Sequence, residues 1–154
     1  MPIEFRVGVT VRKTRDEVAK VVFDPSFTPA WRRGVLEVQS LPDAPLKVGS
    51  TFEWVVRAFA GGRFELLQIV AMEPGVSQTL RSDIATYTFE LSRIAEGTIA
   101  QVTGRIAPTG LQRLLGSWAT ARVRRGWLRD LRQLKRFMES DEYRTWGRED
   151  EAAS

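Results

Sequence analysis

The longest helical signal of the chain lies near its C-terminal end, over residues 110–139. Pro108 precedes this segment, no proline interrupts it, and helix-favouring leucine, arginine, alanine and glutamine are frequent in it. A helix of this length extends about 45 Å at ~1.5 Å per residue, longer than most helices of globular proteins. Because the preceding segments have the pattern of short strands, we expect this one helix to cover one curved sheet.

Seven segments before the helix alternate apolar and polar residues with a period of two, which is typical of strands with one buried face. The first covers residues 3–11, and the other six follow between residues 35 and 106. Short turns separate these six strands, which favours an antiparallel meander. Gly61 and Gly62 are expected to form one of the turns, because both can adopt positive φ.

Two short helices are expected after the first strand. Thr14 and Glu17 have the spacing of a capping box, in which the threonine hydroxyl accepts the Glu17 amide. This helix should end at Asp24 and Pro25, and the second should cover residues 29–33. The predicted fold class is therefore α+β, with a curved antiparallel seven-stranded sheet wrapped around a long C-terminal helix.

The chain is expected to form a single domain over residues 1–140, followed by a polar, flexible tail over residues 141–154. Tyr143 and Trp146 are the tail residues that could dock on the domain. A monomer and a homodimer are both compatible with the sequence. No stretch approaches the ~18 apolar residues of a transmembrane segment, and no signal sequence is evident, so a cytoplasmic location is expected.

The composition restricts the available chemistry. The chain has no histidine and no cysteine, which excludes an imidazole base, a thiol nucleophile and zinc sites built on imidazole or thiolate ligands. Catalysis would depend on carboxylates, tyrosine, lysine, arginine or a bound cofactor. No residue pattern indicates a metal or a cofactor, so neither is expected.

Positive charge is concentrated toward the C-terminal end. Between Arg105 and Met138, nine side chains are basic and one, Asp130, is acidic, whereas the rest of the chain is net negative. One interpretation is a helix with a solvated basic face. The alternative is a surface for phosphate or anionic lipid, including a peripheral membrane contact. Specific nucleic-acid binding is not expected, because no aromatic residues for base stacking are interleaved on that face.

Projected at ~100° per residue, the long helix shows an apolar arc that is expected to face the sheet. Arg124 is a conspicuous member of this arc, since a buried arginine requires a partner or an anionic ligand. Arg124 is therefore the first candidate for a functional polar residue. The residues expected within the arc are Leu114, Ser117, Trp118, Ala121, Arg124 and Leu128, and those expected at its edge are Trp127, Leu131, Leu134 and Met138.

The strand positions expected to face the helix mix large aromatic residues with small ones, namely Ala58, Ala100 and Gly104. Small residues opposite a helix leave space, so we expect a cavity with aromatic walls and few polar groups, as in many small-molecule sites. A solid core is the alternative. Besides the residues of the helix arc, the expected ligand-binding residues are Trp31, Phe52, Trp54, Gln68, Gln78, Ser82, Tyr87 and Phe89.

Several local motifs occur in a characteristic order: residues 24–31 with Gly34-Val35, residues 45–50, residues 87–91, Gly97-Thr98 and residues 131–135. Together with the element order, they resemble the START-like (SRPBCC) helix-grip superfamily, and within it the polyketide cyclase/dehydrase and lipid-transport group. The resemblance extends over residues 3–139. It implies a hydrophobic cavity between the sheet and the long helix that binds lipids, polyketides or similar molecules.

Three functions remain open. The first is a binding or carrier protein for a hydrophobic small molecule of the lipid, polyketide or aromatic type. The second is an enzyme similar to the polyketide cyclases and dehydratases, for which the resemblance leaves Tyr87 and Arg124 as the candidate catalytic residues, since histidine is absent. The third is an interaction module that uses the basic helix on anionic surfaces.

Overall fold

The computed structural model describes residues 2–58, 61–107 and 116–147. One antiparallel sheet contains all seven strands in the order β1-β7-β6-β5-β4-β3-β2, so the meander from β2 to β7 is closed at one edge by β1. The strand bounds are β1 Ile3–Val11, β2 Val35–Gln39, β3 Thr51–Ala58, β4 Gly61–Glu73, β5 Ser77–Arg81, β6 Ala85–Ile94 and β7 Gly97–Ile106.

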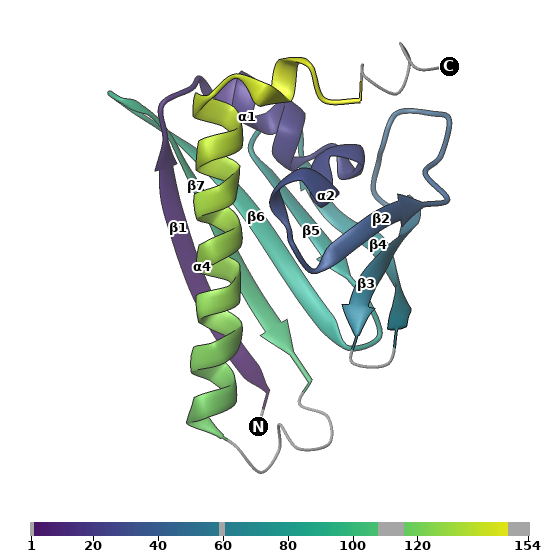
Figure 1. Cartoon of the computed structure of the whole chain (residues 1–154). Coiled ribbons are helices and arrows are strands. Elements are labelled where there is room, and N and C mark those ends of the chain that lie inside the picture. Colours follow the sequence, from purple (N-terminus) through teal and green to yellow (C-terminus); the bar gives the residue numbers. More distant parts are fainter. Residues whose placement is uncertain (1, 59–60, 108–115, 148–154) are drawn as a thin grey trace.

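The sheet curves around the long helix α4 (Ser117–Glu139), which lies beside β1 (Figure 1). The short helices α1 (Arg15–Val22) and α2 (Thr28–Trp31) follow β1, with a 3-10 turn η1 (Pro25–Phe27) between them. They lie beside the C-terminal half of α4 (Figure 1). The predicted fold class is therefore confirmed. No helix of the described ranges is long and apolar enough to cross a membrane.

Local capping explains where the short helices begin. The Thr14 hydroxyl accepts the backbone N–H of Glu17 at 3.2 Å, as the capping box predicts. Thr14 is the N-cap, and α1 starts directly after it at Arg15. Asp24 then accepts the Ser26 N–H at 3.0 Å, and Pro25 occupies the first position of η1. The starting points of the first two short helical elements between β1 and β2 are thus encoded by neighbouring residues.

The register between β3 and β4 determines which β4 residues face α4. Phe52 pairs with Leu67 and Trp54 pairs with Glu65, and all four are buried. Residues directly opposite each other share a face of the sheet, so Glu65, Leu67 and Ile69 face inward, up to a bulge between Ile69 and Ala71. The alternation predicted for this strand is wrong before the bulge, because Phe64, Leu66 and Gln68 are exposed, whereas Met72 beyond it packs against the core.

The glycine pair expected at the β3–β4 turn is also placed differently. Gly61 and Gly62 belong to β4, where they pair with Ala58 and Arg57. The prediction of a turn at these two glycines was wrong. Both glycines extend the ladder between β3 and β4.

The buried face of α4 differs from the predicted arc. Trp118 is 49% exposed, and Ser117, Ala121 and Arg124 are exposed as well, whereas Leu114 lies outside the described residues. Only one face of the helix can contact the sheet, and the larger apolar side chains determine which face it is. Leu128, within the predicted arc, packs partly against the core, and four residues expected at the edge of the arc are buried: Trp127, Leu131, Leu134 and Met138. The other buried residues of α4 are Ala119, Asp130 and Phe137.

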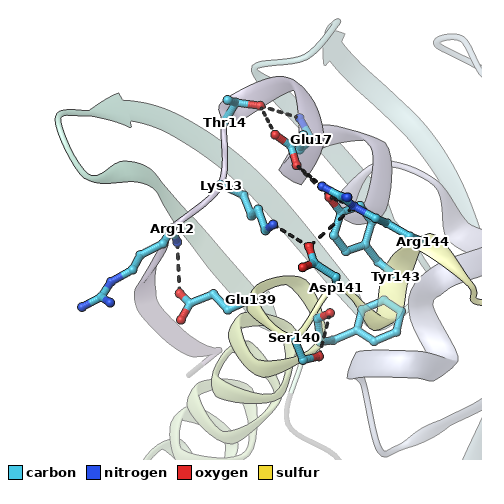
Figure 2. Close-up of polar contacts among 10 residues, drawn as sticks. Arg12, Lys13, Thr14, Glu17, Glu139, Ser140, Asp141, Tyr143 and Arg144 are labelled. Carbon is cyan, nitrogen blue, oxygen red and sulfur yellow. Dashed lines mark hydrogen bonds and ion pairs between the residues drawn. The ribbon is translucent and has the colours of Figure 1, made fainter.

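Polar contacts attach the C-terminal end of α4 to the β1–α1 connection (Figure 2). Glu139 accepts the Arg12 N–H at 3.0 Å, and Lys13 Nζ donates to Asp141 at 2.6 Å. The Tyr143 hydroxyl, in the 3-10 turn η2 (Glu142–Arg144), donates to Glu17 at 2.7 Å. We call these three contacts the polar clasp.

The two tail residues named as possible docking residues, Tyr143 and Trp146, contact the domain. Tyr143 is fixed by its hydrogen bond to Glu17, and the Trp146 ring packs edge-on against Phe137 with 5.7 Å between ring centroids. The described residues after Ser140 therefore lie against the domain.

Candidate functional site

A groove of about 920 Å³ lies between the N-terminal half of α4 and one end of the sheet. Its buried walls include Tyr87 on β6 and Trp127 on α4, and its polar groups include Arg32, which follows α2, and Asp130 on α4. Exposed arginines from β3 and α4 form its rim: Arg57, Arg122, Arg125 and Arg129. This size falls within the range of about 300–1,000 Å³ that is usual for small-molecule sites.

The aromatic residues behind the groove pack against one another around Trp127. The ring centroid of Trp127 lies 5.2 Å from that of Tyr87, 5.9 Å from that of Phe89 and 5.7 Å from that of Phe5. The Phe5 ring also fills the place where a side chain at Gly104 would lie, so the space expected at this glycine is occupied by the protein. The groove borders this aromatic cluster.

Arg32 and Asp130 form a buried ion pair at the groove. Arg32 Nε donates to Asp130 Oδ2 at 3.2 Å, and the guanidinium lies over the Trp127 ring at 3.5 Å from its centroid. Stacking on an aromatic face and a charge-assisted hydrogen bond together fix the orientation of the arginine. Asp130 is only 4% exposed, and its Oδ1 accepts no hydrogen bond from the described residues. This oxygen is itself buried, so it lies in the protein interior and is not exposed to the open groove.

A second buried carboxyl group lies close to this ion pair. Glu65 is directly opposite Trp54 in the β3–β4 ladder and is 4% exposed. Glu65 Oε2 and Trp54 Nε1 are both buried without a hydrogen-bond partner among the described residues. Burial raises the pKa of Glu65 above its ordinary value, and the nearby Arg63 and Arg32 oppose this effect. The protonated form of Glu65 is thus favoured relative to a carboxyl group in water.

Tyr87 shares this environment. Burial, and secondly the charge of Glu65, raise the pKa of Tyr87 to about 12, so its hydroxyl is protonated at neutral pH. The Tyr87 ring packs between Trp54, at 5.7 Å between centroids, and Trp127. The groove is therefore lined by a phenol, a carboxyl group and a guanidinium beside an aromatic wall, and the carboxyl group of Glu65 lies buried behind this lining.

Known structures share this arrangement of helices and strands. StfQ, the di-domain ARO/CYC of the steffimycin biosynthetic pathway, superposes with a TM-score of 0.70 at 16% identity over 92% of this chain and 52% of its own. For DynU16, from the dynemicin biosynthetic locus, the TM-score is 0.68 at 24% identity, covering 90% and 48%. For TTHA0849 from Thermus thermophilus it is 0.73 at 14% identity, covering 90% and 98%. The chain has the helix-grip fold.

The helix-grip fold expected from the resemblance to the START-like superfamily is thus confirmed. The chain spans about half the length of StfQ and of DynU16. No protein-family model matches the chain, and no curated protein sequence matches it.

Some predicted site residues lie in the interior of the helix-grip fold. Trp31, Phe52, Trp54, Tyr87 and Phe89 are buried, and of these five Tyr87 lines the groove. Two further polar candidates, Gln78 on β5 and Ser82 just after it, form hydrogen bonds within the protein.

The hydrogen-bond partners of Gln78 and Ser82 are close to them in sequence. Gln78 is buried and donates to Met72 Sδ at 3.9 Å. Ser82 Oγ accepts the N–H groups of Ile84 and Ala85 at 3.3 and 3.2 Å, which stabilises the β5–β6 turn.

Other predicted site residues face solvent in this helix-grip fold. Arg124 is exposed because α4 is rotated relative to the predicted arc, so it does not form a catalytic pair with the buried Tyr87. Trp118 borders the groove but is half-exposed. The expectation that these positions are buried was wrong for four residues on α4 and one on β4: Ser117, Trp118, Ala121, Arg124 and Gln68.

The sequence-based prediction missed Arg32, Glu65 and Asp130 as site residues. Asp130 carries a recognisable signal, because it is the single acid in a strongly basic segment. It also follows Trp127 by three residues and therefore lies on the same face of α4. Arg32 and Glu65 carry no comparable local signal. No group of three or more acidic side chains in the described part of the chain could hold a metal ion.

Replacing Glu65 with glutamine is expected to increase the free energy of unfolding at neutral pH. The folded-state pKa of Glu65 is raised, so its ionisation in the folded protein opposes folding once the pH exceeds the ordinary value of 4.5. The stabilisation should therefore disappear below pH 4.5, where the carboxyl group is protonated in both states. Urea denaturation across this pH range measures the effect.

The matched control is Glu90→Gln, which removes an exposed carboxylate from β6 and should have little effect at any pH. A destabilising Glu65→Gln at neutral pH would contradict the prediction and indicate that the ionised carboxylate is stabilised by Arg32 or Arg63.

Proposed function

We propose that the groove beside α4 binds a hydrophobic small molecule of the lipid, polyketide or aromatic type, and that the protein is a binding or carrier protein. The observation that carries this proposal is the groove itself, which has a volume of about 920 Å³ and is walled by the aromatic rings of Tyr87 and Trp127. Its few buried polar groups include the Arg32–Asp130 pair, and an apolar wall with a small number of fixed polar groups is typical of a small-molecule site.

The walls of the groove suit a ligand with a flat apolar body. Tyr87 and Trp127 offer aromatic surface, and aromatic pairs gain stability beyond the area that they bury. The fixed Arg32–Asp130 pair would orient the polar end of the ligand, and the arginines of the rim favour a ligand with negative charge at its outer end. Two structures with the same fold come from the steffimycin pathway and the dynemicin locus, which supports a biosynthetic small molecule.

Titration with 2-naphthol, followed by quenching of tryptophan fluorescence, tests the proposal. We expect saturable binding to the unmodified protein and binding at least about tenfold weaker in Val123→Phe, which narrows the groove. Ile99→Phe, on the exposed side of β7, is the control and should bind normally. Equal affinity in the two variants, or no saturable binding at all, would contradict the proposal.

Glu65 favours a second candidate function, an enzyme of the cyclase or dehydratase type. A buried carboxyl group with a raised pKa, close to a phenol and a guanidinium, is a typical arrangement for proton transfer. In such an enzyme the cationic group would be Arg32, which lines the groove, and not the exposed Arg124 expected from the sequence. Turnover of a polyketide-type substrate should then fall in Glu65→Gln and in Tyr87→Phe, and full activity of both variants would exclude the enzyme.

A further inference from the structure

A row of arginines extends along the face of α4 that is directed away from the sheet. At ~100° per residue, its five members fall within about 80° of arc, and the row is about 21 Å long at ~1.5 Å per residue. All five side chains are exposed. We call this row the arginine stripe; it consists of Arg122, Arg125, Arg129, Arg132 and Arg136.

The charge of the stripe is not neutralised within the described part of the chain. None of its arginines forms an ion pair with an acidic side chain there. The two acids of α4 are engaged elsewhere, since Asp130 is buried against Arg32 and Glu139 accepts from Lys135 and from the Arg12 N–H. Among the residues that the structure describes, the stripe therefore presents a straight line of positive charge without an acidic partner.

Trp118 continues the stripe at its N-terminal end. Its side chain is 49% exposed, and the Arg122 guanidinium lies 5.4 Å from its ring centroid. An exposed indole beside a cation is favoured at the level of phospholipid headgroups, where its ring contacts apolar lipid and its N–H contacts water. Trp118 and three stripe arginines also line the groove, so the stripe and the groove mouth are continuous.

We propose that the arginine stripe and Trp118 dock the protein on an anionic phospholipid membrane. Unpaired arginines complement the negative headgroups, and each basic side chain near such a surface strengthens binding about fivefold. Trp118 supplies the interfacial anchor. A nucleic acid fits less well, because the stripe has a single aromatic residue, at its end, and none interleaved for base stacking. The docking stands independently of the proposed function, and it would place the groove mouth at the lipid surface.

Vesicle flotation tests this proposal. The protein should bind vesicles of phosphatidylcholine mixed with phosphatidylglycerol, not vesicles of phosphatidylcholine alone, and added salt should release it. Arg132 and Arg136 belong to the stripe but do not line the groove. The double variant Arg132→Gln/Arg136→Gln should bind the anionic vesicles about 25-fold more weakly, with 2-naphthol binding unchanged.

The matched control is Arg81→Gln/Arg93→Gln, which removes the same charge from exposed positions on β5 and β6 and should bind the vesicles nearly as well as the unmodified protein. Trp118→Ser should also weaken binding, although it leaves the net charge unchanged. Three results overturn the proposal: no binding to anionic vesicles at low salt, an equal loss in both double variants, or displacement of the protein from the vesicles by a short RNA. Loss of 2-naphthol binding alone would concern only the proposed function.

Discussion

Trp127→Ala is expected to lower the free energy of unfolding by about 3–5 kcal/mol. The side chain is 3% exposed and packs against Phe5, Tyr87 and Phe89, and Arg32 is stacked on it. Its removal would leave a cavity at the centre of the contact between helix and sheet. Denaturation by urea or guanidinium, monitored by circular dichroism, measures the loss.

Trp118→Ala is a closely matched control for this variant. The same chemical change occurs on the same helix, but at an exposed position, so the free energy of unfolding should change by about 0.5 kcal/mol or less. A larger loss for Trp118→Ala than for Trp127→Ala would mean that α4 buries the face expected from the sequence. The pair of variants therefore decides the rotation of α4 about its own axis.

Gly97→Ala is expected to destabilise the protein by about 3 kcal/mol or more. Gly97 has φ of +148°, and a side chain there would collide with the backbone oxygen of Val11 and lie 3.0 Å from Arg12 Cα and from Lys13 N. Backbone atoms cannot move aside as the end of a flexible side chain can. The midpoint of chemical denaturation should fall accordingly.

Gly34→Ala provides the comparison, because no atom lies within 4 Å of the place that its side chain would take. We expect a change in stability of about 0.5 kcal/mol or less. If Gly97→Ala were equally mild, the β1–α1 connection would have to shift without cost, contrary to the close backbone contact. The neighbouring Thr98 supports the tight fit, since its hydroxyl donates to the Lys13 carbonyl at 2.8 Å.

The parts of the fold that depend on neighbouring residues could be predicted from the sequence. The Thr14 cap, the Asp24-Pro25 boundary and the alternation in β1 or β6 are all local patterns. The motif Gly97-Thr98 was recognised, but its physical role required the contact with the β1–α1 connection.

The inward face of β4 required information from its partner strand. Both parities of this strand contain apolar residues, so Phe64 and Leu66 looked as suitable for the core as Leu67 and Ile69. Pairing with β3 resolves the choice, because the buried Trp54 stands opposite Glu65. A prediction that paired the two strands across a short loop would have placed Glu65 inside.

The candidate site could not be assembled from the sequence because its polar groups come from three distant segments. Arg32, Glu65 and Asp130 meet only when the sheet, the α2–β2 connection and α4 are in place. The predicted orientation of α4 about its axis was wrong and placed Arg124, which is exposed, toward the sheet. Asp130, the isolated acid, was the one member that charge patterning alone could have indicated.

The polar clasp and the buried Glu65 respond to acid in opposite directions. Tyr143 lowers the pKa of Glu17, Lys13 lowers that of Asp141, and Lys135 and the Arg12 N–H lower that of Glu139. These carboxylates stabilise the folded state above their ordinary pKa values, and the stabilisation is lost as the pH falls through the lowered ones. Acidification should thus weaken the contacts of the clasp, while protonation removes the penalty at Glu65. The buried side chains of Phe137 and Met138 keep the end of α4 on the sheet, so acid should loosen the residues after α4 before it affects the groove.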